Sequence, residues 1–294
     1  MTVATQMEAG PLAVKVTATK EKVGSGLTVL RALPKPELQA VGPFVFLDHF
    51  GPATPPKGGV PAHPHAGIDV VSYLLDGEND HRDSFGNATT VAAGGAQWIG
   101  SGRGMLHAEV LRGSANGEME SVQLWARQAE SRDDAPPTYG AAAARDIPLA
   151  VLPEKANMRL LAGALPQIFG EREGPVGLTR PALLVHARIA PGATISAPLP
   201  EAFDMAVYVL SGVAGVGGSR LARGDLAALR RAAEVELANL DKAQPLAVLL
   251  LGGAPLPQPP LFRGPYVFDS AEALERAFAD YSAGRMGRLD GVPS

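Results

Sequence analysis

Residues 63–87 read HPHAGIDVVSYLLDGENDHRDSFGN, and this stretch indicates how the chain folds. Its middle part, residues 70–75, is a short run of β-branched, aromatic and aliphatic residues that ends at a turn-forming Asp-Gly pair. Similar short runs, bounded by Gly, Pro, Asn or Asp, occupy residues 121–125, 182–189 and 205–210. Many short strands separated by turns predict an all-β sandwich or barrel.

The same stretch is repeated later in the chain. YLLDG (73–77) is matched by YVLSG (208–212), 135 residues further on. About 20 residues after each copy, a second turn matches: AGGA (93–96) aligns with ARGD (222–225) at an offset of 129 residues. The simplest interpretation is that two copies of one β-module follow each other in tandem.

This repeat divides the chain into two domains. We expect a first barrel over residues 1–134 and a second over residues 154–294. The Ala/Pro-rich segment 135–153 is expected to be the crossover between them.

One helix is expected near the end of the second domain, over about residues 269–284. Leu274, Phe278 and Tyr281 recur at helical spacing, which predicts one apolar face. Asp269 with Glu272 three residues later resembles a capping box, so Asp269 is the predicted N-cap.

Composition narrows the function classes. The chain has 294 residues, a formal net charge of −4 and no cysteine, so disulfides, thiolate metal sites and cysteine nucleophiles are excluded. The mild acidity argues against direct nucleic-acid binding, which needs a basic face. Neither a signal peptide nor a membrane span is evident, so we expect a cytoplasmic protein without membrane contact, and a monomer.

The histidines predict a metal site. His63 and His65 are two residues apart, as are His107 and Glu109, and side chains at this spacing on a strand share one face. If the two strands are neighbours, three imidazoles and a carboxylate converge inside one barrel. Such a set suits Fe, Ni, Mn or Cu with open coordination positions.

The second copy of the module is expected to bind no metal. The 135-residue offset carries His63 and His65 onto Pro198 and Pro200, which cannot coordinate. The 129-residue offset carries His107 and Glu109 onto Glu236 and Ala238, which leaves one carboxylate at most.

The remaining histidines are given other roles. His186 has no ligand-type neighbour and is expected to be structural or exposed. His81, within NDHRDS (79–84), is expected at a solvated hairpin tip. His49 is placed at the mouth of a cavity, and not as a ligand.

These motifs together resemble the pirin family, a branch of the two-domain cupins. The likeness covers most of the chain and is most specific in its first half. The stretches that carry it are residues 41–52, 63–87, 94–109, 122–125, 206–216 and 264–281.

The resemblance implies two cupin barrels of the double-stranded β-helix, or jelly-roll, type, packed face to face, with one metal ion in the first. It implies His63, His65, His107 and Glu109 as ligands. Asp69, an acidic position that is not a ligand in pirins, shares strand parity with His65 and is kept as a fallback. Fe(II) is the first expectation, with Ni, Mn, Cu or Zn as alternatives.

The resemblance also implies an oxidoreductase of the flavonol (quercetin) 2,3-dioxygenase type, with O2 as co-substrate. Glu109 would be both ligand and general base for the substrate's 3-hydroxyl. Two alternatives stay open: a non-enzymatic, iron-dependent regulator that binds a protein partner, and an enzyme for another small molecule. The candidate walls of the substrate pocket are Phe44, Phe46, Trp98 and Met105.

Overall fold

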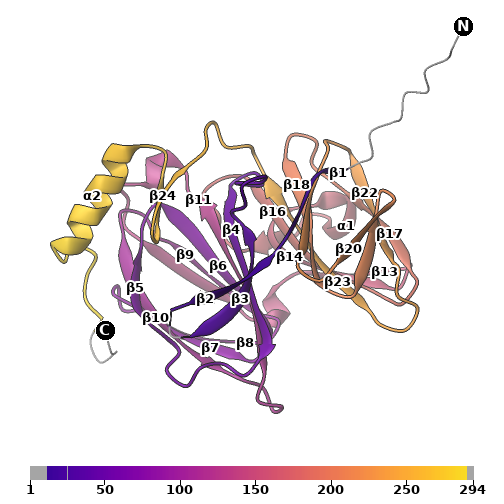
Figure 1. The fold of residues 1–294 in the computed structure, drawn as a ribbon, viewed down its shortest axis with the longest axis horizontal. Helices are drawn as coiled ribbons and strands as arrows, with labels where there is room; N and C mark the ends of the chain where they lie inside the picture. Colours follow the sequence, from indigo (N-terminus) through magenta and orange to yellow (C-terminus); the bar gives the residue numbers. More distant parts are fainter. Residues whose placement is uncertain (1–11, 25, 290–294) are drawn as a thin grey trace, which may run out of the picture.

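Two β-barrels lie side by side in the computed structural model, which describes residues 12–24 and 26–289. Figure 1 shows the first barrel with α2 on its outer side and the second barrel at the opposite end. Each barrel is built from one large and one small antiparallel sheet. The expected pair of all-β barrels with a C-terminal helix is therefore confirmed.

The first barrel contains a seven-stranded sheet in the order β12-β9-β6-β11-β4-β3-β2 and a four-stranded sheet in the order β5-β10-β7-β8. Its strands are β2 (Thr19–Val23), β3 (Leu27–Leu33), β4 (Phe44–Ala53), β5 (Val60–His65), β6 (Ile68–Asp76), β7 (Glu78–Asp83), β8 (Ala88–Ala92), β9 (Ala96–Gly100), β10 (Met105–Arg112), β11 (Met119–Arg127) and β12 (Thr138–Ala142).

The second barrel repeats this plan, with a large sheet in the order β1-β21-β18-β23-β16-β14-β13 and a small sheet in the order β17-β22-β19-β20. Its strands are β1 (Leu12–Thr17), β13 (Leu149–Leu152), β14 (Ala156–Ala164), β15 (Glu173–Pro175), β16 (Ala182–Ile189), β17 (Thr194–Pro198), β18 (Asp204–Ser211), β19 (Val213–Val216), β20 (Ser219–Ala222), β21 (Asp225–Leu229), β22 (Glu234–Asn239) and β23 (Leu246–Gly253). A short helix, α1 (Pro166–Phe169), follows β14.

The repeated motif marks equivalent positions in the two barrels. Gly77 after β6 and Gly212 after β18 both adopt left-handed backbone, with φ of 82° and 83°. In the second match, the N–H of Gly94 donates to Leu74 and that of Gly224 donates to Val209. Gly94 is therefore equivalent to Gly224, an offset of 130 residues, and the expected offset of 129 is wrong by one.

This correction changes what stands opposite the metal-site residues. At an offset of 130, His107 corresponds to Leu237 on β22, which pairs with Ile195 on β17 just as His107 pairs with His63. Both Leu237 and Ile195 are buried in the apolar core of the second barrel, whereas Glu236 is exposed. The equivalent pair of inward positions thus carries aliphatic side chains. By the same pairing, His63 and His65 correspond to Ile195 and Ala197, so the expected match with Pro198 and Pro200 is wrong.

The two large sheets pack against each other through one hydrophobic core. Two hydrogen bonds cross this interface in a symmetric way: Tyr73 of the first barrel bonds His186 of the second (2.8 Å), and Tyr208 of the second bonds His49 of the first (3.1 Å). The two tyrosines are the equivalent first residues of the repeated motif. His186 is buried, which agrees with a structural role and not with the alternative of an exposed side chain. His49 is also buried and lies in the interface between the barrels rather than at the mouth of a cavity.

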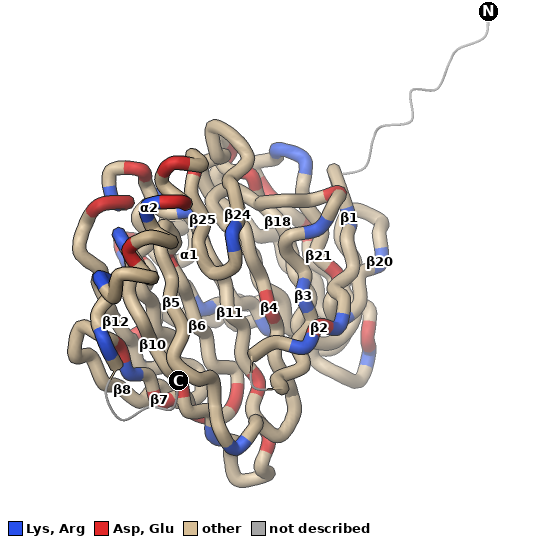
Figure 2. The backbone as a smooth tube through the Cα atoms, turned by 60° about the vertical axis from the view of Figure 1, so that its left-hand side comes forward, with Lys and Arg blue, Asp and Glu red and all other residues tan. Residues whose placement is uncertain are grey.

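The two chain ends cross between the barrels, which the division at residues 134 and 154 does not anticipate. Near the N-terminus, β1 pairs with β21 in the second barrel. Near the C-terminus, the hairpin of β24 (Leu261–Arg263) and β25 (Tyr266–Phe268) and helix α2 (Ala271–Ser282) pack on the first barrel, where Tyr266 bridges to Ala66. Figure 2 shows this hairpin beside the upper ends of β6, β11 and β4.

Helix α2 forms where the sequence predicted it, but with a different cap and a different buried face. Ser270, not Asp269, is the N-cap, and its hydroxyl accepts a hydrogen bond from the Ala273 N–H. The helix buries Ala273, Leu274 and Ala277, while Phe278 and Tyr281 are largely exposed. A face with small residues lets the helix lie close to the barrel.

Candidate metal centre

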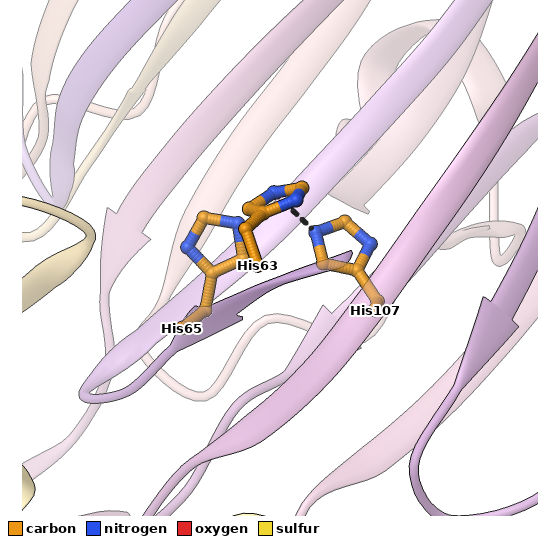
Figure 3. A group of neighbouring side chains, drawn as sticks. All are labelled: His63, His65 and His107. Carbon is orange, nitrogen blue, oxygen red and sulfur yellow. Dashed lines mark hydrogen bonds between the residues drawn. The ribbon is translucent and has the colours of Figure 1, made fainter. Parts of the chain in front are cut away.

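Three histidines meet inside the first barrel because their strands are neighbours. β5 pairs with β10 so that His63 stands directly opposite His107, and His65 follows His63 on the same face. The register with β5 shifts between His107 and Glu109, whereas β10 stays in register with β7 through both residues. Figure 3 shows the three rings facing one another, with the dashed contact between His63 and His107.

The ring nitrogens are close enough to share one ion. The Nε2 atoms of His63 and His107 are 2.9 Å apart, and the His65 ring centre is 4.9 Å from that of His63. One ligand atom from each of the three residues lies within 4.8 Å of the others. His65 Nε2 is buried and has no hydrogen-bond partner, so this atom is free to coordinate.

The electrostatics also suit metal binding. Burial lowers the pKa of His65 well below its usual 6.5, and the neighbouring His63 lowers it further. Burial likewise lowers the pKa of His107, with further lowering from His63, His65 and His81. Both imidazoles are therefore neutral at pH 7, which is the form that binds a metal.

Glu109 lies at the edge of this group rather than inside it. The carboxylate belongs to a second set of potential ligands, with His107 and His81. Its Oε1 accepts hydrogen bonds from Asn79 Nδ2 and Gln97 Nε2, each at 2.7 Å. Two buried amides therefore hold one carboxylate oxygen, and the other oxygen takes no part in these bonds.

His81 is not at a solvated tip, and this expectation is wrong. It lies within β7, its side chain is buried, and its ring stacks on Tyr139 at 4.3 Å. Its Nε2 is 3.1 Å from Asp83 Oδ2. Along β7, Asn79, His81 and Asp83 face inward and their neighbours face outward. Because all of these residues are polar, the alternation is not visible as a hydrophobic pattern in the sequence.

A cavity of about 740 Å³ opens beside the histidines, lined by His63, His65 and Glu109. Of the four expected wall residues, only Phe46 lines it. Phe44 belongs to the core between the barrels with Trp98 packed against it, and Met105 to a cluster around Ile68. Trp125 forms the wall beside the metal site instead, since its ring meets His65 edge-on at 5.1 Å.

Asp69, the fallback ligand, binds Thr179 and not the histidine group. Its Oδ2 accepts hydrogen bonds from the backbone N–H and the hydroxyl of Thr179, both at 2.7 Å. Burial raises the pKa of Asp69 to about 6. The carboxylate fastens the segment before β16 to the first barrel, and it is in neither of the two potential ligand groups of the described residues.

Comparison with known proteins agrees with this architecture. The Pirin family model matches residues 26–126, and the Pirin C-terminal cupin domain matches residues 184–287. The chain belongs to the pirin family. In this pirin, the first match contains all four expected ligands, and the second covers most of the second barrel and continues through α2.

Similar proteins come from a plant and from bacteria. A pirin-like protein of Solanum lycopersicum is 30% identical over 93% of this chain and 91% of its own length. A Pseudomonas aeruginosa protein named "Putative quercetin 2,3-dioxygenase" is 32% identical over 92% of this chain and 96% of its own. The crystal structure of a quercetin 2,3-dioxygenase from Acinetobacter baumannii superposes with a TM-score of 0.84 at 25% identity, covering 96% of this chain and 93% of that one.

Within the described residues, no helix is both long and apolar enough to cross a membrane.

Proposed function

We propose that this pirin is a metal-dependent dioxygenase that opens a hydroxylated aromatic ring system of the flavonol type, such as quercetin, with O2. The observation that carries the proposal is the group of three mutually facing histidines, two of them neutral through burial, at the wall of a cavity of about 740 Å³. Relatives and a structural neighbour named as quercetin 2,3-dioxygenases support the choice of reaction.

The donor set fits a transition-metal ion. His63, His65 and His107 would hold it through ring nitrogens, and the unpartnered His65 Nε2 supports this assignment. Glu109 would be the fourth ligand. Nitrogen and carboxylate donors suit Fe(II) first, with Ni, Mn, Cu or Zn as alternatives. When bound, the ion supplies Lewis acidity and open positions for substrate and O2.

Glu109 has the chemistry of a general base. Asn79 and Gln97 fix its Oε1, and its second oxygen would accept the proton of the substrate's 3-hydroxyl. Trp125 and Phe46 stack on each other in the cavity wall and would confine a flat ring. The apolar side chains of the cavity wall would displace water from the faces of the bound ring.

An aerobic absorbance assay tests the proposal. The protein is stripped of metal, reloaded separately with Fe(II), Ni, Mn, Cu or Zn, and mixed with quercetin. We expect loss of the flavonol band with at least one metal, uptake of O2, and no loss with metal-free protein. A stable band with every loaded form would contradict the dioxygenase function and favour a regulatory role.

A further inference from the structure

A row of polar side chains crosses the floor of the cavity. Cross-strand pairing places Arg31 opposite Asp48, Asp48 opposite Gln123, Gln123 opposite Ser72, and Ser72 opposite Gln97. This polar row therefore runs over five adjacent strands, β3, β4, β11, β6 and β9. The first four residues line the cavity, and the fifth hydrogen-bonds Glu109.

The polar row links the metal centre to a distant end of the cavity. Neighbouring strands are about 4.8 Å apart, so the backbones of Gln97 and Arg31 are about 19 Å apart measured along the curved sheet, and their side chains converge on its concave, cavity side. The cavity-lining residues that flank the polar row, two positions before or after it on the same strands, are mostly apolar. Phe50 and Leu74 lie on one side of the row, and Phe46 and Trp125 lie on the other. A flat ring system can therefore bury its faces while its polar edge follows the row.

An aromatic stack reaches the same distant end independently. The Trp125 ring meets His65 at 5.1 Å, and Phe46 stacks on Trp125 at 4.0 Å with an interplanar angle of 11°. The Arg31 guanidinium lies over the Phe46 ring at 4.5 Å. Arg31 thus has its position fixed by an aromatic face as well as by a carboxylate.

The Arg31–Asp48 pair has little net charge to offer an anion. Arg31 Nε and one terminal nitrogen bind the two Asp48 oxygens at 2.8 and 2.7 Å, the bidentate geometry in which the two charges offset each other. The Asp48 side chain is 9% exposed and that of Arg31 is 27% exposed. A carboxylate placed here would meet Asp48 as well as Arg31, whereas a hydroxyl can donate to Asp48 and accept from Arg31.

We propose that the Arg31–Asp48 pair is a second recognition point for the substrate. The pair binds a neutral hydroxyl on the substrate ring that lies farthest from the histidines, and it rejects a carboxylate at that position. This inference rests on the proposed function, because it takes the metal-bound end of the ligand to lie at the histidines. It assigns the preferred substrates to aromatic systems that carry hydroxyls at both ends.

The test compares probes that differ only at the far end. These are 3-hydroxyflavone and its hydroxy and carboxy derivatives, each made at the 4′ and at the 7 position so that both ligand orientations are covered. Binding to metal-loaded protein is followed without O2, through quenching of tryptophan fluorescence, because Trp125 lines the cavity. At one of the two positions we expect the hydroxy derivative to bind about tenfold tighter than the parent, the size of one hydrogen bond to a charged group. The carboxy derivative should bind more weakly than the parent.

Removing one charge of the pair should reverse the ranking. In Asp48→Asn, Arg31 is no longer neutralised, so the carboxy derivative should bind at least about tenfold tighter than the hydroxy derivative. Asp204→Asn, which changes an exposed partner of Arg231 on the second barrel, should keep the wild-type ranking. The double variant Arg31→Met/Asp48→Leu leaves no unpaired charge and should bind all derivatives within about threefold of one another.

Equal binding of all probes by the wild-type protein would overturn the inference, and so would an unchanged ranking in Asp48→Asn. If that variant fails to fold, the wild-type ranking and the double variant decide the question. The ranking is measured without turnover and can be repeated on metal-free protein. If the protein is inactive but keeps the ranking of the probes, only the dioxygenase function is refuted. If the protein is active but does not show that ranking, only the role of the Arg31–Asp48 pair is refuted.

Discussion

Glu109 shares its Oε1 between Asn79 and Gln97, and this arrangement decides which substitution is informative. Glutamine has nearly the same volume, and its side-chain oxygen can accept the same two hydrogen bonds. Glu109→Gln should therefore keep the fold and reduce quercetin turnover by about two to four orders of magnitude, the usual contribution of a general base. Stopped-flow absorbance measures the rate, and wild-type turnover in the variant would assign the base to another group.

His186 gives a prediction about pH. Burial, with Arg188 and Arg159 nearby, lowers the pKa of His186 to about 3, whereas the unfolded chain titrates near 6.5. Between these values the unfolded state binds more protons, so the free energy of unfolding should fall as pH drops from 6.5, by up to about 1.4 kcal/mol per pH unit. Urea unfolding midpoints of the metal-free protein from pH 7 to pH 4 measure this slope.

The matched control replaces both partners of the hydrogen bond between Tyr73 and His186. Tyr73→Phe/His186→Phe removes the titrating imidazole together with the hydroxyl that binds it, so neither group is left buried without its hydrogen-bond partner. The stability of this variant at pH 7 should therefore stay near that of the wild type. Its slope below pH 6.5 should be smaller. An identical slope in both proteins would show that His186 does not govern the acid response.

Local spacing in the sequence predicted only part of the histidine group. It placed His63 and His65 on one face of a strand, whereas the pairing of that strand with the strand of His107 was a condition that the structure meets. The role of these residues as ligands stays a prediction. His81 was misplaced because an inward-facing strand that lines a polar site lacks the usual apolar alternation. The pair of Arg31 with Asp48 depends on cross-strand register, which a single sequence does not encode visibly.

Among the elements, the C-terminal hairpin and α2 depend on a buried ion cluster. Arg127 on β11 is fully buried and binds Asp133 at 2.7 and 2.8 Å and Asp269, just before α2, at 3.0 Å. It also donates to the Gly67 carbonyl, at the turn after His65. This one guanidinium therefore joins the metal-site turn to the segment that precedes the helix.

Arg127→Met should leave Asp269 with only the more distant Arg180 (3.6 Å) and Asp133 with only the Gln128 amide. We expect this loss of a buried charge to destabilise the protein by about 3–5 kcal/mol. We expect faster proteolytic cleavage within residues 254–270 and a lower Tm. Arg231→Met is the matched control, because its partner Asp204 is 3.8 Å away at the surface and such pairs contribute about 0–1 kcal/mol. Equal Tm values for the two variants would contradict a structural role of the cluster.

The elements themselves were predicted unevenly. All four strands taken from the sequence formed, and β16 has the expected limits, because short apolar runs between turns are a strong local signal. The N-cap is one residue later than predicted. Asp269 pairs with Arg127, and Ser270, which is an equally good N-cap residue by local preference, caps the helix.

The two barrels of the molecule differ in the side chains available to bind a metal ion, and this difference can be tested. The first has three facing histidines, and the second has Ile195 and Leu237 at the positions of His63 and His107. Elemental analysis of protein purified without added metal should therefore give one transition-metal ion per chain. His107→Ala should lose it, whereas His186→Ala should not. Two ions per chain would refute the single-site prediction.

The crossing of the chain ends has a consequence for splitting the gene. The expected crossover of residues 135–153 contains β12 of the first barrel and β13 of the second, so the connection between the barrels is residues 143–148. A break there leaves an N-terminal piece that carries β1 of the second barrel and a C-terminal piece that carries the hairpin bordering the first barrel's cavity. Each piece thus lacks a strand or wall that only the other supplies. Expressed together, the two pieces should assemble into a stable non-covalent heterodimer, detectable by co-purification through a tag on one of them. Recovery of metal binding would then report that the two polypeptides have met, which is the property required of a split-protein sensor.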